Sequence, residues 1–291
     1  MDYIKSPYNW VGNKYKYLDI INSFNFEQYE HVIDVMMGSG NILFNIIANG
    51  KNYVGNDKQG LLPDIYNLIN KNDIEFNLSD IDNVLNRFNR FSTKESYYVF
   101  RDYWNKKYLN NIRDRIFCVE TALLLKMCSN SMVRFNPTEG YFNQGFRGLG
   151  KKKEFFTDQM KSIIVNGLNN LQSLFNDKKF YFLNEDFEYC ITRPKDRSLL
   201  IIDPPYILRK DMYDTDFSKE DDERLLELLK NTRHDFIYFN YLQRENIVNE
   251  SLNNFINSKS YKVIDINNGT MAGQGRSKNI KEVREVIITN V

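Results

Sequence analysis

The sequence has few of the residues that build metal centres or disulfide frameworks. Its 291 residues include only three cysteines and two histidines. Cys118, Cys128 and Cys190 form no CxxC pair, and they lack metal-ligand spacing to His31 or His234. We therefore expect buried, reduced thiols and no zinc or other metal site.

Long apolar runs and a secretory signal are also missing. No segment approaches the roughly 18 consecutive apolar residues that a membrane helix needs. The opening residues, MDYIKSPYNWVGNKYKYL, show no apolar core followed by a small-residue cleavage site. These absences predict a cytoplasmic protein with no membrane partner.

A strong excess of one charge is absent, since the net charge is only +1. Acidic residues elsewhere can cancel a basic patch in this total, so the value does not exclude a nucleic-acid partner. Basic and aromatic residues alternate in two stretches, residues 101–108 and 134–153. Such stretches are typical of nucleic-acid surfaces, but a solvated protein face has the same composition.

The apolar pattern indicates an α/β fold. Short apolar runs predict buried strands at residues 31–36, 52–55, 179–183, 199–202 and 235–240. Helix-like segments alternate with them at residues 41–48, 59–70, 155–175, 218–231 and 243–255. This alternation predicts a doubly wound, Rossmann-like parallel sheet.

Two regions depart from the alternation. Residues 261–266 and 282–290 predict two strands joined by a polar, glycine-containing loop, which together would form a hairpin at the sheet edge. Residues 73–150 have a mainly helical pattern and no strand signal. We therefore expect one domain made of residues 1–72 and 151–291, with residues 73–150 inserted as a second domain.

A glycine-containing turn follows the first predicted strand, in the sequence Asp-Val-Met-Met-Gly-Ser-Gly-Asn that begins at Asp34. Gly38 and Gly40 would let the backbone turn sharply and approach a ligand at the carboxyl end of the strand. Leu43 stands where a dinucleotide fingerprint has its third glycine, which argues against a pyrophosphate ligand. A tight turn without a ligand is the alternative interpretation.

Asp57 follows the second predicted strand, about twenty residues beyond Asp34, where an acid can accept hydrogen bonds from both ribose hydroxyls of an adenosine-containing ligand. An isolated aspartate after a strand is more often a turn former or a helix cap. The ribose interpretation therefore depends on the preceding glycine turn.

The most specific motif is Asp-Pro-Pro-Tyr at residues 203–206, directly after a buried strand. Consecutive prolines end strand pairing and leave a rigid projection. Asp203 and the carbonyl of Pro204 offer hydrogen-bond acceptors to an amino group, and Tyr206 offers a flat face to an extruded base. A simple proline stop after a strand is the alternative.

Residues 203–206 resemble the catalytic motif of amino-methyltransferases, and with the glycine turn and Asp57 they are similar to the Dam-like adenine-specific DNA methyltransferases of the alpha group. Residues 9–14, Asn-Trp-Val-Gly-Asn-Lys, resemble the family's opening motif, whose tryptophan and lysine contact the cofactor. Residues 184–187, Asn-Glu-Asp-Phe, resemble its element that meets the adenine ring of S-adenosylmethionine. Met36 stands where the family usually has phenylalanine, a change that the flexible methionine side chain tolerates.

The resemblance implies transfer of a methyl group from S-adenosylmethionine to the N6 amino group of a flipped adenine in double-stranded DNA, without a metal. The implied catalytic residues are Asp203, Pro204 and Tyr206. The implied cofactor-binding residues are Trp10, Lys14, Asp34, Gly38, Gly40, Asp57, Asp186, Phe187 and Asp203. The alternatives are methylation of RNA adenine or of the cytosine N4 amino group, and a catalytically silent DNA-binding protein of the same fold.

The predicted helical module also carries family elements. Residues 134–136 and 140–147 resemble the Arg-Tyr-Asn and Phe-Asn-x-Pro-Phe-Gly elements that face DNA. Arginine suits guanine edges and asparagine suits adenine edges in the major groove, although asparagine in a glycine-rich loop is often a turn residue. The candidates for DNA contact are Arg134, Asn136, Asn143 and Arg147.

Gly145 stands where the family's DNA-facing element usually has proline. This departure lies in the recognition loop, so it weakens the transfer of the family's common target, GATC, to this chain. For the assembly we expect a monomer or a weak dimer, with two copies on one DNA as a further arrangement.

Overall fold

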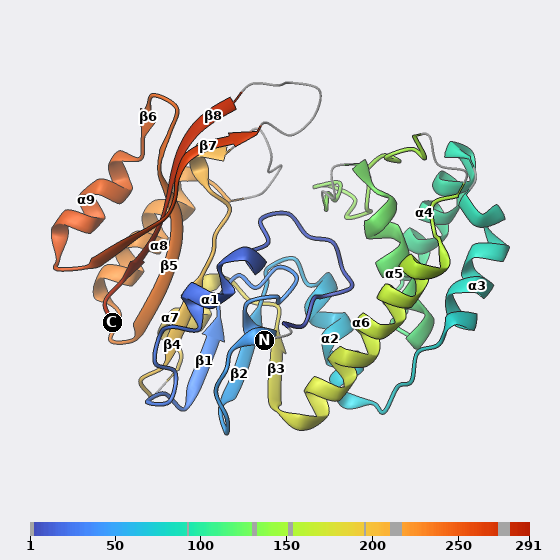
Figure 1. Ribbon diagram of the computed structural model, residues 1–291, viewed down its shortest axis with the longest axis horizontal. Helices are drawn as coiled ribbons and strands as arrows, with labels where there is room; N and C mark the ends of the chain where they lie inside the picture. The colour runs from blue at the N-terminus through green and yellow to red at the C-terminus, as the bar shows by residue number, and fades with distance from the viewer. Residues whose placement is uncertain are drawn as a thin grey trace. The chain divides into compact units, whose positions relative to one another are not determined.

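The computed structural model describes residues 3–91, 93–129, 133–150, 154–194, 196–209, 217–272 and 280–291 (Figure 1). Its contacts divide the chain into two compact units. The first unit combines the N-terminal segment up to Asn13 with Asp64–Asp177, and the second combines Lys14–Pro63 with Lys178–Val291. The expected module of residues 73–150 falls within the first unit, and its role in target recognition remains a prediction.

A mixed β-sheet forms the centre of the second unit. Its strands run in the order β3 (Lys179–Leu183), β2 (Asn52–Asn56), β1 (His31–Asp34), β4 (Leu199–Ile202), β5 (Asp235–Arg244), β8 (Ile280–Thr289) and β7 (Lys262–Ala272). The strands from β3 to β5 are parallel, whereas β8 pairs antiparallel with both β5 and β7. This sheet confirms the predicted α/β class and the predicted hairpin at its edge.

Three helices, α7 (Phe187–Thr192), α8 (Lys219–Asn231) and α9 (Glu250–Ser258), pack on one face of this sheet. Their apolar side chains form a core with alternate residues of the strands, since successive strand side chains point to opposite faces. The strand side chains that point to the other face of the sheet, such as those of Val32, Ile201 and Ile237, are also buried. A parallel sheet buried on both faces explains why its strands read as continuous apolar runs.

The first unit is mainly helical. Its helices are α3 (Leu78–Arg87), α4 (Lys94–Leu109), α5 (Arg115–Met127) and α6 (Asp158–Asp177), together with most of α2 (Leu61–Lys71) (Figure 1). Asn77, Thr93 and Asp114 cap α3, α4 and α5 by accepting hydrogen bonds from first-turn N–H groups. Trp104 is fully buried and stacks on Phe117 with ring centroids 5.2 Å apart. The helical insert predicted from the sequence is confirmed.

The helix predicted at residues 41–48 is only a 3-10 turn, η2 (Leu43–Asn45). The side-chain amide of Asn45 donates to the Asn41 carbonyl at 2.7 Å, and this is the carbonyl that an α-helix would bond to the Asn45 N–H. The Asn45 N–H instead bonds the carbonyl of Ile42 at 3.0 Å. Local side-chain bonding therefore replaces the expected helix.

The helix predicted at residues 243–255 begins later than expected. Strand β5 continues to Arg244 and pairs with a short strand, β6 (Ile247–Val248), before α9 begins. The Asn249 side chain caps α9 by accepting a hydrogen bond from the Leu252 N–H. Among the described residues, no helix is both long enough and apolar enough to cross a membrane.

Candidate active site

Acidic residues gather where the central parallel strands of the second unit end. Asp34 closes β1, Asp57 follows β2 and Asp203 follows β4, and β1 pairs with both of the other strands. Burial raises the pKa of Asp34 well above its usual value, and the neighbouring carboxylates of Asp203 and Asp57 raise it further. The three predicted acids therefore lie together at the carboxyl edge of the sheet.

The glycine turn after β1 has the backbone that the sequence predicts. Gly38 and Gly40 adopt φ angles of 50° and 73°, in the left-handed region that favours glycine. A Cβ atom on Gly40 would also collide with the ring of Phe44. The carboxylate of Asp57 accepts hydrogen bonds from the N–H groups of Gly38 and Gln59, each at 2.9 Å, so it fastens this turn to the end of β2.

Asp203 is held by two groups. The Lys14 ammonium lies 2.8 Å from Oδ2, and the Tyr206 hydroxyl lies 2.9 Å from Oδ1. Burial raises the pKa of Asp203, whereas Lys14 and the Tyr206 hydroxyl lower it. Lys14, which the resemblance assigns to the cofactor, therefore contacts the predicted catalytic carboxylate.

Glu285 on β8 is a further member of this cluster that sequence analysis missed. Its buried carboxylate accepts a hydrogen bond from the Tyr17 hydroxyl at 2.7 Å, and it lies 3.2 Å from the Tyr206 hydroxyl and 3.8 Å from the Lys14 ammonium. A phenol has one hydrogen, so Tyr206 donates to Asp203 or to Glu285 at any moment. The sequence gives no distinct signal for Glu285, because the first half of β8 carries four charged residues, Lys281, Glu282, Arg284 and Glu285.

The Tyr206 ring is only 4% exposed. It meets the Tyr241 ring edge-on at a centroid distance of 4.6 Å, and the Lys14 ammonium lies 5.0 Å from its centroid. The hydroxyl group contacts the carboxylates of Asp203 and Glu285. Stacking of an extruded base on this ring stays a prediction.

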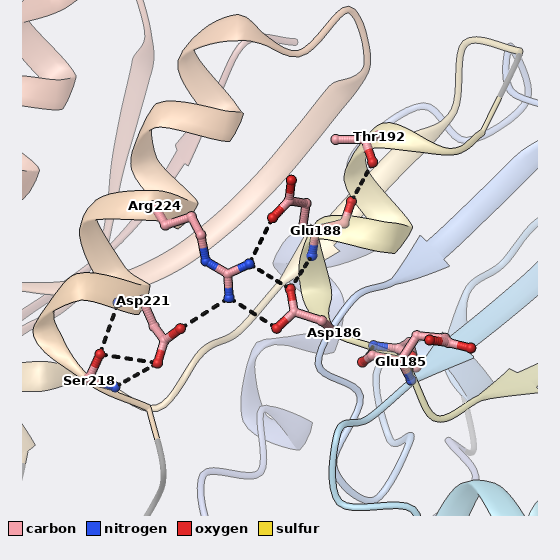
Figure 2. A network of polar contacts seen from close by, with 8 residues as sticks. Glu185, Asp186, Glu188, Thr192, Ser218, Asp221 and Arg224 are labelled. Carbon is pink, nitrogen blue, oxygen red and sulfur yellow. Dashed lines mark hydrogen bonds and ion pairs between the residues drawn. The ribbon is translucent and has the colours of Figure 1, made fainter.

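Residues 184–187, which resemble the family element that meets the cofactor's adenine ring, form the predicted adenine loop. This loop is joined to the end of β2. The Asn56 side chain donates to the Glu185 carbonyl at 3.0 Å, and the Glu185 N–H donates back to the Asn56 side chain at 2.9 Å. Asp186 then caps α7 by accepting from the Glu188 N–H, and Figure 2 shows its carboxylate facing Arg224. The Phe187 side chain is buried in the core beneath α7 and α8.

These residues fit the chemistry of S-adenosylmethionine, which presents an ammonium, a sulfonium, ribose hydroxyls and an adenine amino group. Oδ1 of Asp34 is buried and has no hydrogen-bond partner among the described residues. A buried acceptor beside two further carboxylates favours a cationic or hydrogen-donating ligand. Asp34, Asp57 and Asp186 are the side chains that would hold it.

The DNA-contact candidates lie in a loop of the first unit, in which Phe135 and Phe142 form an isolated β-bridge. The Asn136 side-chain oxygen accepts from the N–H groups of Thr138 and Glu139 at 2.9 and 2.8 Å. Asn136 is therefore a turn former in this structure, the alternative that its glycine-rich context left open. Its contact with DNA stays a prediction.

The other three DNA-contact candidates differ in exposure. Arg134 and Arg147 are exposed, whereas Asn143 is partly buried. The Asn143 side-chain oxygen is buried without a hydrogen-bond partner in the described part of the chain. Trp10, predicted to contact the cofactor, also belongs to this unit and is partly buried, and the basic residues 151–153 lie outside the described residues.

One group of possible metal ligands occurs among the described residues, formed by Glu30, His31 and Asp196. These residues lie at the start of β1 and before β4, at the amino edge of the sheet rather than at the carboxyl edge. Glu30 and Asp196 are strongly exposed, with 66% and 69% of their side chains accessible. This group is separate from the acidic cluster around Asp203.

Comparisons with known proteins agree with the motifs. The profile of the D12 class N6 adenine-specific DNA methyltransferases matches residues 10–268. The chain is 24% identical to the Type II methyltransferase M.FokI of Planomicrobium okeanokoites and 24% identical to the modification methylase StsI of Streptococcus sanguinis. Each comparison covers 99% of this chain and 43% of the relative, so the chain spans less than half the length of these relatives. Because the family profile covers most of the sequence, the chain belongs to the D12 class N6 adenine-specific DNA methyltransferase family, as its motifs predicted.

Proposed function

We propose that this protein transfers a methyl group from S-adenosylmethionine to the N6 amino group of adenine in double-stranded DNA. The observation that carries the proposal is the Lys14–Asp203–Tyr206 arrangement at the end of β4, beside Asp34 and Asp57. It combines a buried acceptor with further acidic residues suited to a cationic cofactor. Family membership supports the same reaction.

Asp203 and the Pro204 carbonyl accept the two N–H bonds of the target amino group in this proposal. Neither group donates through these oxygens while Asp203 is ionised, so the nitrogen lone pair stays available for attack. Lys14 favours the ionised form of Asp203. Bound S-adenosylmethionine would supply the methyl group on a sulfonium leaving group and depart as S-adenosylhomocysteine. The ionised Asp203 would accept the proton that the methylated nitrogen loses. The contribution of the protein is then alignment and preorganised electrostatics.

Adenine in a duplex hides its amino group, so the base has to leave the stack at a cost of a few kcal/mol. Stacking on Tyr206 would offset part of this cost, since base–aromatic stacking contributes roughly 1–3 kcal/mol. Because the Tyr206 ring is buried by its neighbours, such stacking requires the ring to become accessible when DNA binds.

The DNA is proposed to contact the loop that contains the exposed Arg134 and Arg147. Guanidinium groups pair with guanine edges or with phosphates. GATC is the candidate target because it is common in the family, and Gly145 in place of proline permits a different sequence.

The test is transfer of labelled methyl from S-adenosylmethionine to unmethylated double-stranded DNA, followed by nucleoside mass spectrometry and modification-aware sequencing. N6-methyladenine at one short sequence is expected. N4-methylcytosine, or label in RNA alone, would move the protein to one of the alternative substrates. Binding of cofactor and DNA without transfer would instead favour a catalytically silent protein.

Two variants connect this test to the site. Asp203→Ala is expected to abolish transfer while leaving DNA binding largely intact. Asp196→Ala is the matched control, because this exposed aspartate flanks the same strand at its amino end. Equal activity of the two variants would contradict the assignment of Asp203.

A further inference from the structure

The Arg224 side chain on α8 contacts three carboxylates, those of Asp186, Glu188 and Asp221. Asp186 belongs to the predicted adenine loop. Its Nη1 atom lies 2.8 Å from Oδ1 of Asp186 and its Nη2 atom lies 3.0 Å from Oδ2, which is a bidentate pair. Figure 2 shows the guanidinium between Glu188 and Asp186, with Asp221 on the remaining side. A planar guanidinium that binds both oxygens fixes the orientation of a carboxylate as well as its charge.

The loop that carries Asp186 is fixed from its other side by the end of β2. The side chains and backbone of Asn56 and Glu185 exchange two hydrogen bonds, and the Asn184 side chain donates to the Asp57 carbonyl at 2.9 Å. Asp57 is the proposed ribose acceptor, and the base of an adenosine is attached to that ribose. Asp186 therefore occupies the loop next to the ribose site, where the cofactor's adenine ring would extend.

We propose that Arg224 is a positioning residue that orients Asp186 to accept a hydrogen bond from the amino group on the cofactor's adenine ring. This inference rests on the proposed function, because it takes S-adenosylmethionine as the ligand. Arg224 acts through Asp186, so it determines cofactor specificity without contacting the reacting atoms.

The charges at this site favour the same role. Arg224 is the main cause of the lowered pKa of Asp186, so the carboxylate stays ionised and can only accept hydrogen bonds. Adenine presents an amino donor at its C6 position, whereas hypoxanthine presents a carbonyl oxygen. The oriented Asp186 carboxylate therefore favours adenine. Opposite the hypoxanthine carbonyl, two acceptors would face each other with no hydrogen between them.

Arg224 also fixes the surroundings of Asp186. Its guanidinium lies 4.1 Å from the centroid of the Phe187 ring, and it contacts Asp221, which forms a capping box with Ser218 at the start of α8. The N-terminus of α7 and the first turn of α8 are thus joined through one side chain. Replacement of Arg224 removes both guanidinium contacts from the Asp186 carboxylate and leaves it the weaker hold of the Glu188 N–H. The β2 contacts still hold the neighbouring Glu185.

The experiment compares the dissociation constants of S-adenosylhomocysteine and S-inosylhomocysteine by calorimetry. The second compound has a carbonyl oxygen in place of the adenine amino group. The wild-type protein is expected to bind the adenine compound at least about tenfold more tightly, since one hydrogen bond to a charged group distinguishes the two. Arg224→Met is expected to reduce this preference severalfold. Arg224→Lys is expected to fall between wild type and Arg224→Met, because an ammonium keeps the charge but lacks the planar fork that orients both oxygens.

Arg284→Met is the matched control. Arg284 forms a comparable two-bond pair with Asp265, and its exposed fraction of 39% resembles the 37% of Arg224. Arg284 lies on β8, outside the α7–α8 contact. The Arg284→Met variant should therefore lose a similar amount of stability and still prefer the adenine compound. A double variant, Asp186→Asn with Arg224→Met, should show no greater loss of preference than Asp186→Asn alone, since both changes act through one carboxylate.

Three outcomes would overturn the inference. An unchanged preference in both Arg224 variants, with equal weakening of the two compounds, would make Arg224 a purely structural residue. Equal binding of the two compounds by the wild-type protein would show that Asp186 does not select the amino group, and methyl transfer could still establish the proposed function. Absence of binding by either compound would overturn the proposed function and this inference with it.

Discussion

The Lys14 ammonium lies 2.8 Å from Oδ2 of Asp203, although 189 positions separate the two residues in the sequence. Both side chains are largely buried, with exposed fractions of 6% and 18%. Removal of one member of a buried ion pair leaves an uncompensated charge on the other. Lys14 is therefore the group that makes an ionised Asp203 tolerable at this site.

Lys14→Met is expected to lower methyl transfer at pH 7 by about tenfold or more. Burial already raises the pKa of Asp203, and loss of the cation raises it further, so the ionised acceptor forms only at higher pH. The acidic limb of the profile of kcat/KM against pH should move upward, with partial recovery of activity near pH 9. Lys16→Met, which changes an exposed neighbour, should leave the profile unchanged. An unmoved acidic limb in Lys14→Met would contradict this role.

Glu285→Gln is expected to lower kcat about tenfold, which corresponds to one weakened hydrogen bond at the reacting group. The glutamine amide can donate to the Tyr206 oxygen, and the Tyr206 hydrogen would then turn toward Oδ1 of Asp203. That hydrogen competes with the amino group of the substrate for the same oxygen.

Tyr17→Phe separates this effect from simple packing around Glu285. It removes the hydrogen bond to the other oxygen of Glu285 and leaves Tyr206 untouched. Single-turnover rates on DNA should fall in Glu285→Gln and change little in Tyr17→Phe. Similar losses in both variants would show that Glu285 only supports the local fold.

Local sequence was sufficient to predict the parallel strands and the glycine turn. Buried strands require continuous apolar runs, and the left-handed backbone at Gly38 and Gly40 requires glycine. The contact of Glu285 with Tyr206 could not be predicted in this way. Glu285 lies 79 residues from Tyr206 in the sequence, and the antiparallel pairing of β8 with β5 brings the two together. The Arg224–Asp186 pair likewise depends on the packing of α8 beside α7.

Side-chain hydrogen bonding explains why one expected helix was wrong, and it shows a second use for an asparagine whose contact with DNA stays a prediction. Asn45 takes the carbonyl of Asn41 that the expected helix needed, and periodicity does not register that bond. Asn136 uses its side-chain oxygen in a turn, although its residue type also suits an adenine edge. Residue type alone does not distinguish these uses, because each depends on which backbone N–H groups lie within reach.

Arg134→Ala should reduce sequence preference while leaving overall DNA affinity nearly unchanged if Arg134 reads a base edge. Loss of a good bidentate base contact costs roughly 1–3 kcal/mol of discrimination. A phosphate contact would instead weaken binding to all sequences and reduce its salt dependence. These results are distinguished by measuring binding to an unmethylated duplex that contains the target sequence and to a scrambled duplex. Both are measured at several salt concentrations. Asn136→Ala removes the side-chain oxygen that holds the turn. Its effect on binding shows how much of any change comes from loss of the turn alone.

Asp222 on α8 provides a prediction about stability. Its side chain is 1% exposed, and neither carboxylate oxygen has a hydrogen-bond partner among the described residues. Burial raises its pKa from 3.8 to about 6. The folded protein therefore holds this proton more tightly than the unfolded chain does, and its free energy of unfolding falls as pH rises from about 4 to about 6.

Asp222→Asn removes this titration while keeping the shape of the side chain. Relative to wild type, the free energy of unfolding should rise by up to about 3 kcal/mol at pH 8, since each pKa unit corresponds to about 1.4 kcal/mol. Near pH 4 the wild-type side chain is already neutral when folded, so the two proteins should differ little. Urea unfolding across this range measures the difference, with Glu227→Gln as an exposed control on the same helix. A gain that is equal at every pH would show that packing, and not the buried charge, separates Asp222→Asn from wild type.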